Sequence, residues 1–131
     1  MIEMEIPCKA FSINAAYYRT RAVKTAECRA WETQVLEYLA EYKELFEIGE
    51  DHKKAPATYA LELDFIYPDY IFYNKSGEIS SKTFDLSNVE KLLIDLIFEK
   101  TMGVNDKFIV SLLSRKMAGP VHLIRVRLKT L

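Results

Sequence analysis

Hydrophobic and polar residues alternate along three stretches of the chain, and this period of two is typical of β-strands with one buried face. The stretches are residues 1–6, 59–67 and 122–131, and a proline follows each of the first two. In the last stretch Ile124 and the apolar residues at every second position after it face inward, and the basic residues between them face outward. We therefore predict three half-buried strands.

A fourth strand is predicted at residues 108–113, where both faces are apolar. Because a strand with two apolar faces is typically covered on both sides, we expect it in the centre of the sheet. Gly119 and Pro120 then predict a turn. Residues 70–84, with turn-forming residues at 74–77, have the pattern of a β-hairpin or flap.

A helical period predicts a long helix over residues 25–48, with Thr25 as its N-cap and Gly49 as its stop signal. The order of elements is therefore strand, long helix, strand, flap, shorter helix and two strands. This order predicts an α+β fold in which a mixed β-sheet packs against two helices. We expect one small domain over residues 1–131.

The shorter helix is predicted to run from Ser87 to Lys100. Ser87 and Glu90 fit a capping box, so Ser87 is the expected N-cap. Gly103 stands where a helix end often adopts a left-handed conformation. One face of this helix is apolar, and a different stripe carries polar residues at helical spacing, which are Asn88, Lys91, Asp95 and Glu99.

Composition excludes several classes of protein. Half of the 131 residues are hydrophobic, which is enough for a real core. No apolar run is long enough to cross a membrane, and the first residues lack signal-peptide character, so we expect a soluble cytoplasmic protein with no membrane partner. Cys8 and Cys28 lack metal-ligand spacing, and we expect both to be reduced. No Ser/His/Asp triad, phosphate-binding glycine loop or zinc spacing is visible.

The net charge of −1 hides an uneven distribution. Residues 37–51 contain six acidic residues and one lysine, whereas the residues after Asp106 include six basic residues and no acidic one. Such asymmetry permits a basic surface on a nearly neutral protein. Ordinary solvated faces are the alternative.

Acidic residues stand at both ends of the shorter helix and on its polar stripe: Asp85, Asp106 and Asp95. Carboxylate oxygens suit Mg²⁺, which binds one or two carboxylates together with water and phosphate oxygens. A bound cation can activate water for phosphodiester cleavage. Lys91, one turn from Asn88, is placed to hold a phosphate. The alternative is that these acids only cap or solvate the helix.

Residues 12–21 read as an irregular loop that combines aromatic and basic side chains. Arg19, Arg21 and Lys24 are candidates for phosphate binding, and Tyr17 can stack on a base. The alternative is a surface loop that is anchored by a buried tyrosine.

The sequence resembles the RusA family of Holliday-junction resolvases in residues 85–91, at Asp95 and at Asn105–Asp106. That family has Asp-x-Asp-Asn-x-x-Lys at the start of a helix and an Asp-Asp pair after it, and the spacing fits without a gap. The segment from Ser12 to Arg19 is similar to the family's opening loop. Lys116 falls where a family lysine follows the penultimate strand.

The resemblance implies a homodimeric, Mg²⁺-dependent endonuclease, for which Mn²⁺ can substitute, that nicks two strands of a four-way DNA junction symmetrically. Such enzymes are often encoded by phages or prophages and act in the bacterial cytoplasm. The family's metal-binding acids correspond to Asp85 and Asp106, with Asp95 as a further candidate, and its functional lysine corresponds to Lys91. The DNA-binding candidates are Asn14, Tyr17, Arg19, Arg21, Lys24, Asn88 and Lys116.

One departure from the family pattern concerns the second aspartate, which is Ser87 here. A neutral hydroxyl is a poorer ligand for a hard cation. Either Asp95, Asp64 or Asp69 compensates, or metal binding is weaker, or the protein binds DNA with little or no cleavage. A protein-interaction module that works through the acidic helix is a further alternative.

Overall fold

Four strands form one mixed sheet in the computed structural model, which describes residues 1–16, 23–42 and 57–131. They are β1 (Ile2–Ile6), β2 (Tyr59–Pro68), β3 (Ile109–Gly119) and β4 (Leu123–Thr130). Their order across the sheet is β1-β4-β2-β3. The β2–β3 pair is parallel, and β4 is antiparallel to both of its neighbours. The predicted α+β class with a mixed sheet in a single domain is confirmed.

The alternation in the sequence decides which face of the sheet is buried. Leu63 of β2 lies opposite Val126 of β4, which lies opposite Met4 of β1. All three side chains are buried, so three strands share one apolar layer. Each fully buried leucine or isoleucine in such a layer contributes about 1.5–3 kcal/mol through the hydrophobic effect.

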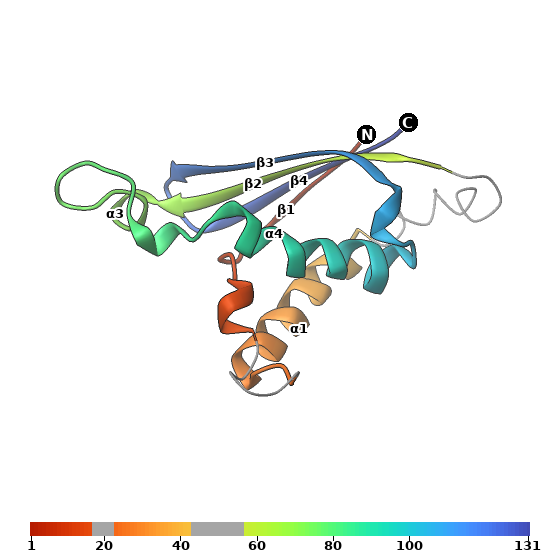
Figure 1. Cartoon of the computed structure of the whole chain (residues 1–131), viewed down its shortest axis with the longest axis horizontal. Coiled ribbons are helices and arrows are strands. Elements are labelled where there is room, and N and C mark those ends of the chain that lie inside the picture. The colour runs from red at the N-terminus through yellow and green to blue at the C-terminus, as the bar shows by residue number, and fades with distance from the viewer. Residues whose placement is uncertain (17–22, 43–56) are drawn as a thin grey trace.

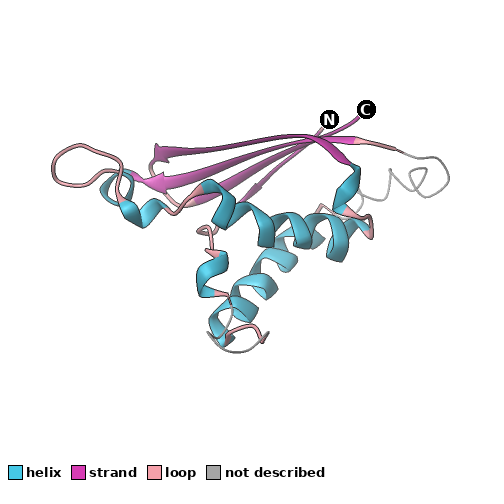
Figure 2. Ribbon diagram, in the orientation of Figure 1, coloured by secondary structure: helices cyan, strands magenta, loops and turns pink. Residues whose placement is uncertain are grey.

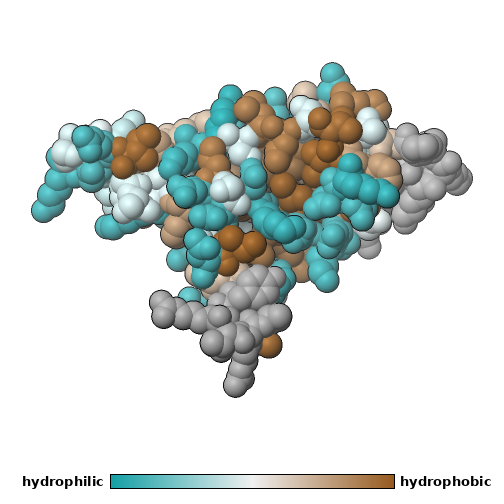
Figure 3. All heavy atoms as spheres, viewed as in Figure 1, coloured by the Kyte–Doolittle hydropathy of each residue, from teal (hydrophilic) through white to brown (hydrophobic). Residues whose placement is uncertain are grey.

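Strand β3 corrects the sequence prediction, because it lies at an edge of the sheet and not in its centre. Within the described part of the chain it pairs with β2 alone. Val110, Leu112 and Leu113 are 60%, 43% and 45% exposed. Figure 3 shows the brown patch along the right-hand part of this strand. The apolar residues on both faces of β3 therefore belong to an exposed edge strand and not to a buried central one.

Two long helical segments cover the same side of the sheet (Figures 1 and 2). Helix α1 (Ala26–Ala40) begins at the predicted N-cap Thr25, whose side chain accepts a hydrogen bond from the Cys28 amide. It ends at Ala40, earlier than predicted, and residues 43–48 lie outside the described residues. Helix α4 (Leu86–Asp95) packs beside β3. Among the described helices, none is both long and apolar enough to cross a membrane.

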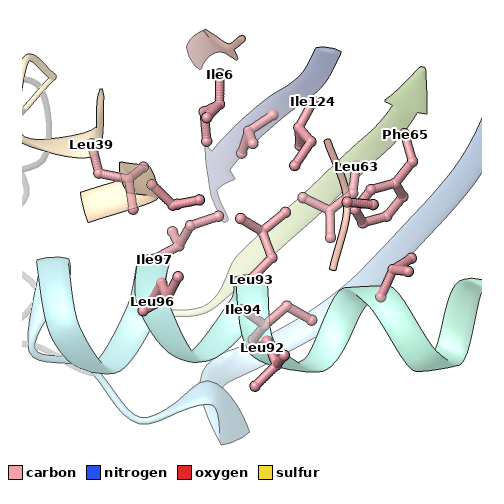
Figure 4. Packing of buried hydrophobic residues seen from close by; sticks show 14 of the residues in the cluster. Ile6, Leu39, Leu63, Phe65, Leu92, Leu93, Ile94, Leu96, Ile97 and Ile124 are labelled. Carbon is pink, nitrogen blue, oxygen red and sulfur yellow. The ribbon is translucent and has the colours of Figure 1, made fainter. Parts of the chain in front are cut away.

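Helix α4 continues without a break into a π-helical segment, η4 (Leu96–Met102). The wider turn is closed in part by the Thr101 hydroxyl, which donates to the carbonyl of Leu96 at 2.8 Å. Leu93 and Ile97 point from α4 and η4 into the space between Leu39 of α1 and the sheet (Figure 4). The core therefore lies between the helices and one face of the sheet.

The start of α4 also differs from the prediction. Asp85 has extended backbone angles and is the N-cap, although its side chain makes no capping hydrogen bond, and Ser87 lies inside the helix. The amide of Asn88 donates to the Asp85 carbonyl at 2.9 Å, which fixes the first turn two residues earlier than the capping box suggested. At the other end, Gly103 has φ 68° and ψ 31°, as predicted for a left-handed cap.

The predicted hairpin over residues 70–84 is present only as its turn. The first arm is a short helix, α3 (Asp69–Phe72), and the two arms meet in a single antiparallel bridge between Tyr73 and Ile79. Gly77 closes the turn with φ 82°. A 3-10 helix, η3 (Ser81–Thr83), then leads to α4.

An ion-pair network covers the sheet face that the helices leave open. Asp64 is 1% exposed and accepts from Arg115 at 2.8 and 3.2 Å and from Arg127 at 3.1 Å. These hydrogen bonds and the charge of Asp64 raise the pKa of Arg115. Arg127 also bonds Glu3 and Glu62 at 3.1 and 3.4 Å. Cations of β3 and β4 are thus neutralised on this face by acids of β1 and β2.

Candidate metal centre and nucleic-acid interface

Three carboxylates converge where the helical segment ends. Asp95 is the last residue of α4, Glu99 lies in η4, and Asp106 opens the 3-10 helix η5 (Asp106–Phe108). One oxygen from each residue lies within 4.8 Å of the other two. Within the described residues this is the one group of three acidic, histidine or cysteine side chains close enough to hold a metal ion.

The chain reverses after η4, which carries Asp106 back to Asp95 and Glu99. The left-handed backbone of Gly103 starts the reversal, and the Val104 amide then donates to the Phe98 carbonyl at 2.9 Å. The Asn105 side chain accepts from the Lys107 amide at 2.8 Å and caps η5. These local bonds fix the direction in which Asp106 leaves the backbone.

The donor set of this acid cluster (Asp95, Glu99 and Asp106) fits a hard divalent cation. Mg²⁺ takes oxygen ligands at about 2.1 Å, so its ligand oxygens lie roughly 3 to 4 Å apart. One oxygen of each carboxylate lies within 4.8 Å of the other two, which is close to that spacing. The Lys91 ammonium is 3.6 Å from the Asp95 carboxylate and offsets one of the three negative charges. The cluster therefore keeps a net negative charge at a partly exposed surface.

A second group of predicted residues lies around the N-terminus of α4. Asn14, Asp85, Asn88 and Lys116 line one cavity of about 320 Å³. The Lys116 ammonium donates to the Thr83 hydroxyl at 3.1 Å and to two backbone carbonyls at 3.3 Å, so its position is well defined. Amide side chains, a lysine and the positive end of a helix are groups that bind phosphate.

Asp85 and Asp106 do not meet within one chain. Asp85 precedes α4 and Asp95 ends it, and ten residues of α-helix span about 15 Å. Asp106 lies with Asp95 at the far end. Two groups of predicted residues are therefore assembled, one at each end of α4, where the sequence suggested a single metal site shared by Asp85 and Asp106.

The remaining candidates divide by location. Lys24 pairs with Glu32 of α1 at 2.8 Å. Tyr17, Arg19 and Arg21 lie outside the described residues. Of the three acids named to compensate for Ser87, Asp64 is held in the arginine network on the other face of the sheet, Asp69 opens α3, and Asp95 alone joins the acid cluster.

Glu99 was not among the predicted ligands. Its signal was present in the sequence, because Glu99 follows Asp95 by four residues on the polar stripe of the helix. No model of a known protein family matches the chain, and no curated protein matches it significantly. The resemblance to the RusA family accordingly rests on the motif residues themselves.

Proposed function

We propose that the protein is a metal-dependent endonuclease that cuts branched DNA, with four-way junctions as its preferred substrate. The observation that carries this proposal is the acid cluster of Asp95, Glu99 and Asp106 beside Lys91. The motif at residues 85–91 and at Asp106 supports the same reading through its resemblance to RusA resolvases.

The three carboxylates of the acid cluster would hold Mg²⁺ or Mn²⁺ through oxygen atoms. The cation supplies the activation of water and the stabilisation of charge that phosphodiester hydrolysis requires. Lys91 offers a positive charge within one helical turn of the cluster and would hold a non-bridging phosphate oxygen. Glu99 is exposed and Asp95 and Asp106 are half-buried, so a DNA strand can reach the cluster from solvent.

The cavity at the N-terminus of α4 would bind the DNA backbone at a distance from the cut. Lys116 supplies a fixed positive charge there, and Asn14 and Asn88 supply amide donors. Asp85 at the same cavity is suited to a second cation or to a base amino group. Contacts at both ends of a helix of this length would fix the direction in which a strand crosses the molecule.

Paired cuts require two sites at a fixed separation, which a two-fold homodimer supplies. Strand β3 is the surface we assign to the second copy, because its outer backbone edge and the side chains of Val110, Leu112 and Leu113 are uncovered in the described part of the chain. An antiparallel pair of β3 strands would be isologous and would place these side chains beside their copies in the partner strand. Helix α4 is joined to β3, because the Ser114 hydroxyl donates to Glu90 at 2.6 Å. The acid cluster of each copy would therefore be held in a fixed position in the dimer.

A nicking assay tests the function directly. A labelled synthetic four-way junction is incubated with the protein in Mg²⁺, Mn²⁺ or EDTA, beside the variant Asp106→Asn and the matched control Asp69→Asn on α3. We expect paired nicks in either metal, none in EDTA, and a loss of about 100-fold or more in Asp106→Asn, since even outer-shell partners of a metal cost 10- to 100-fold. Equal nicking by both variants would contradict the assignment.

A second candidate function is supported by one specific observation, which is the separation of Asp85 from Asp106 together with Ser87 at the second family aspartate. A RusA-like protein that binds junctions with little or no cleavage would show both features. In the same assay, salt-sensitive junction binding that persists in EDTA without nicks would establish this reading.

A further inference from the structure

A second cavity, of about 360 Å³, lies next to the one that contains Asp85. Its wall is built from segments that are far apart in the sequence: the stretch after β1, the first turn of α1, the end of β2, α3, η3 and the residue before β4. Ser12 and Phe84 line both cavities, so the two are neighbours. A volume of this size is within the range of small-molecule sites.

Two buried polar atoms in the wall of this cavity lack a partner. The Tyr67 hydroxyl and the His122 Nδ1 atom make no hydrogen bond with any of the described residues. Both side chains line the cavity, their rings meet edge to face at 5.9 Å, and Tyr67 is 2% exposed. Native structures leave few buried polar groups unpaired, so an unpaired pair at one cavity calls for a ligand or bound water.

The rest of the wall defines the chemistry of that ligand. Phe11 and Phe84 add aromatic rings, Lys9 and Lys82 add two exposed ammonium groups, and Glu27 adds one exposed carboxylate, so the charged groups of the wall sum to one positive charge. Burial and the charge of Lys9 lower the pKa of His122, which favours the neutral ring with one donor and one acceptor. A planar ring with hydrogen-bonding edges and an attached anionic group would satisfy all of these features.

We propose that this cavity binds one nucleotide, with its base beside Tyr67 and His122 and its phosphate between Lys9 and Lys82. The ligand is either a free nucleotide from solution or an unstacked nucleotide of the DNA substrate. The second source rests on the proposed function. In that case the strand would pass Phe84 into the neighbouring cavity of Asp85 and Lys116, and an unpaired base at a branch point would be selected there.

The test uses the full-length protein and two probes, deoxynucleoside monophosphates and a four-way junction with one unpaired adenine at its crossover. Binding is followed by the imidazole resonances of His122 in NMR, assigned with His122→Gln, and by gel shift for the junction. Tyr67→Phe removes only the hydroxyl, and Lys82→Gln replaces the ammonium group with a shorter, neutral amide. The matched controls are Tyr73→Phe and Lys75→Gln, whose side chains are exposed and do not line the cavity.

We expect His122 to shift on addition of a nucleotide, and Tyr67→Phe and Lys82→Gln each to weaken binding by roughly 2- to 10-fold, the range for one hydrogen bond. Both controls should bind as the wild type does. An effect on the monophosphates alone identifies a free nucleotide as the ligand, and an effect on the junction alone identifies DNA. The proposal is overturned if neither probe shifts His122 and the four variants bind the junction equally. Nucleotide binding by a protein that neither binds nor nicks junctions would refute the proposed function and leave this site standing.

Discussion

Neutralising one carboxylate of the acid cluster should have opposite effects on stability with and without metal. The change is Asp106→Asn, which keeps the size and shape of the side chain and removes its charge. Three carboxylates within 4.8 Å of one another repel, and Lys91 offsets only part of that repulsion. Without divalent cations the variant should therefore be more stable than the wild type. With Mg²⁺ the order should reverse.

The magnitude follows from the separation of the charges. Two unit charges at 4.8 Å repel by about 0.9 kcal/mol in a water-like dielectric and by about 3.5 kcal/mol at an effective dielectric constant of about 20. Since Glu99 is exposed, the lower figure applies, and the variant should gain about 0.5–1 kcal/mol, or roughly 2–4 °C in Tm for a chain of this size. A cation bound with a Kd of about 1 mM adds about 1.4 kcal/mol to the wild type at about 10 mM Mg²⁺.

Differential scanning fluorimetry measures both effects, with NaCl at matched ionic strength in place of MgCl₂ and with Asp69→Asn as the control variant. We expect Mg²⁺ to raise the Tm of the wild type and of Asp69→Asn by roughly 5 °C and that of Asp106→Asn by less than about 1 °C. If Mg²⁺ shifts all three proteins equally, or if Asp106→Asn is destabilised without metal, the three acids do not form a cation site.

Two further predictions concern other parts of the molecule. Leu113→Lys on β3 should convert a dimer to a monomer in sedimentation velocity, whereas Val121→Lys in the turn between β3 and β4, which is also exposed, should leave the assembly intact. A wild-type monomer at micromolar concentration would contradict the β3 interface. Since burial lowers the pKa of His122, the unfolded chain takes up this proton at higher pH than the folded chain does, so the free energy of unfolding should fall as the pH drops below about 6.5. Urea denaturation between about pH 7.5 and 5.5 should show this slope in the wild type and a smaller one in His122→Gln, and an unchanged slope would contradict it.

Local patterns predicted most of the elements, because they depend on neighbours in sequence. The Thr25 cap, the Gly103 end and the alternation of β4 were all confirmed, whereas β2 alternates only in its first half and is buried on both faces from Leu63 to Pro68. The place of β3 in the sheet was wrong for a physical reason. Periodicity reports that a residue is apolar, and Leu112 is apolar whether another strand or nothing within the described chain covers it.

In the site, too, contacts between residues close in sequence could be predicted, and contacts between distant residues could not. Asp95 and Glu99 share a helix face, so their approach follows from spacing alone. The alternation of residues 59–67 implies that Asp64 lies on the outer face of its strand, but its burial depends on Arg115 and Arg127, which lie 51 and 63 residues away in the chain. Strand register, which the sequence did not give, decides that contact.

The π-helical segment makes the acid cluster sensitive to the length of the chain as well as to its residues. A π-turn accommodates more residues than an α-turn, so loss of one residue from η4 would let the segment close as a regular α-helix. The change in residues per turn would alter the angle at which Gly103 and Asp106 follow α4, so the approach of Asp106 to Asp95 depends on it. Outward substitutions in η4 do not disturb this register. Natural variants of the chain should therefore keep Glu99 and the number of residues between Asp95 and Asp106, while the other outward positions of η4 vary in identity.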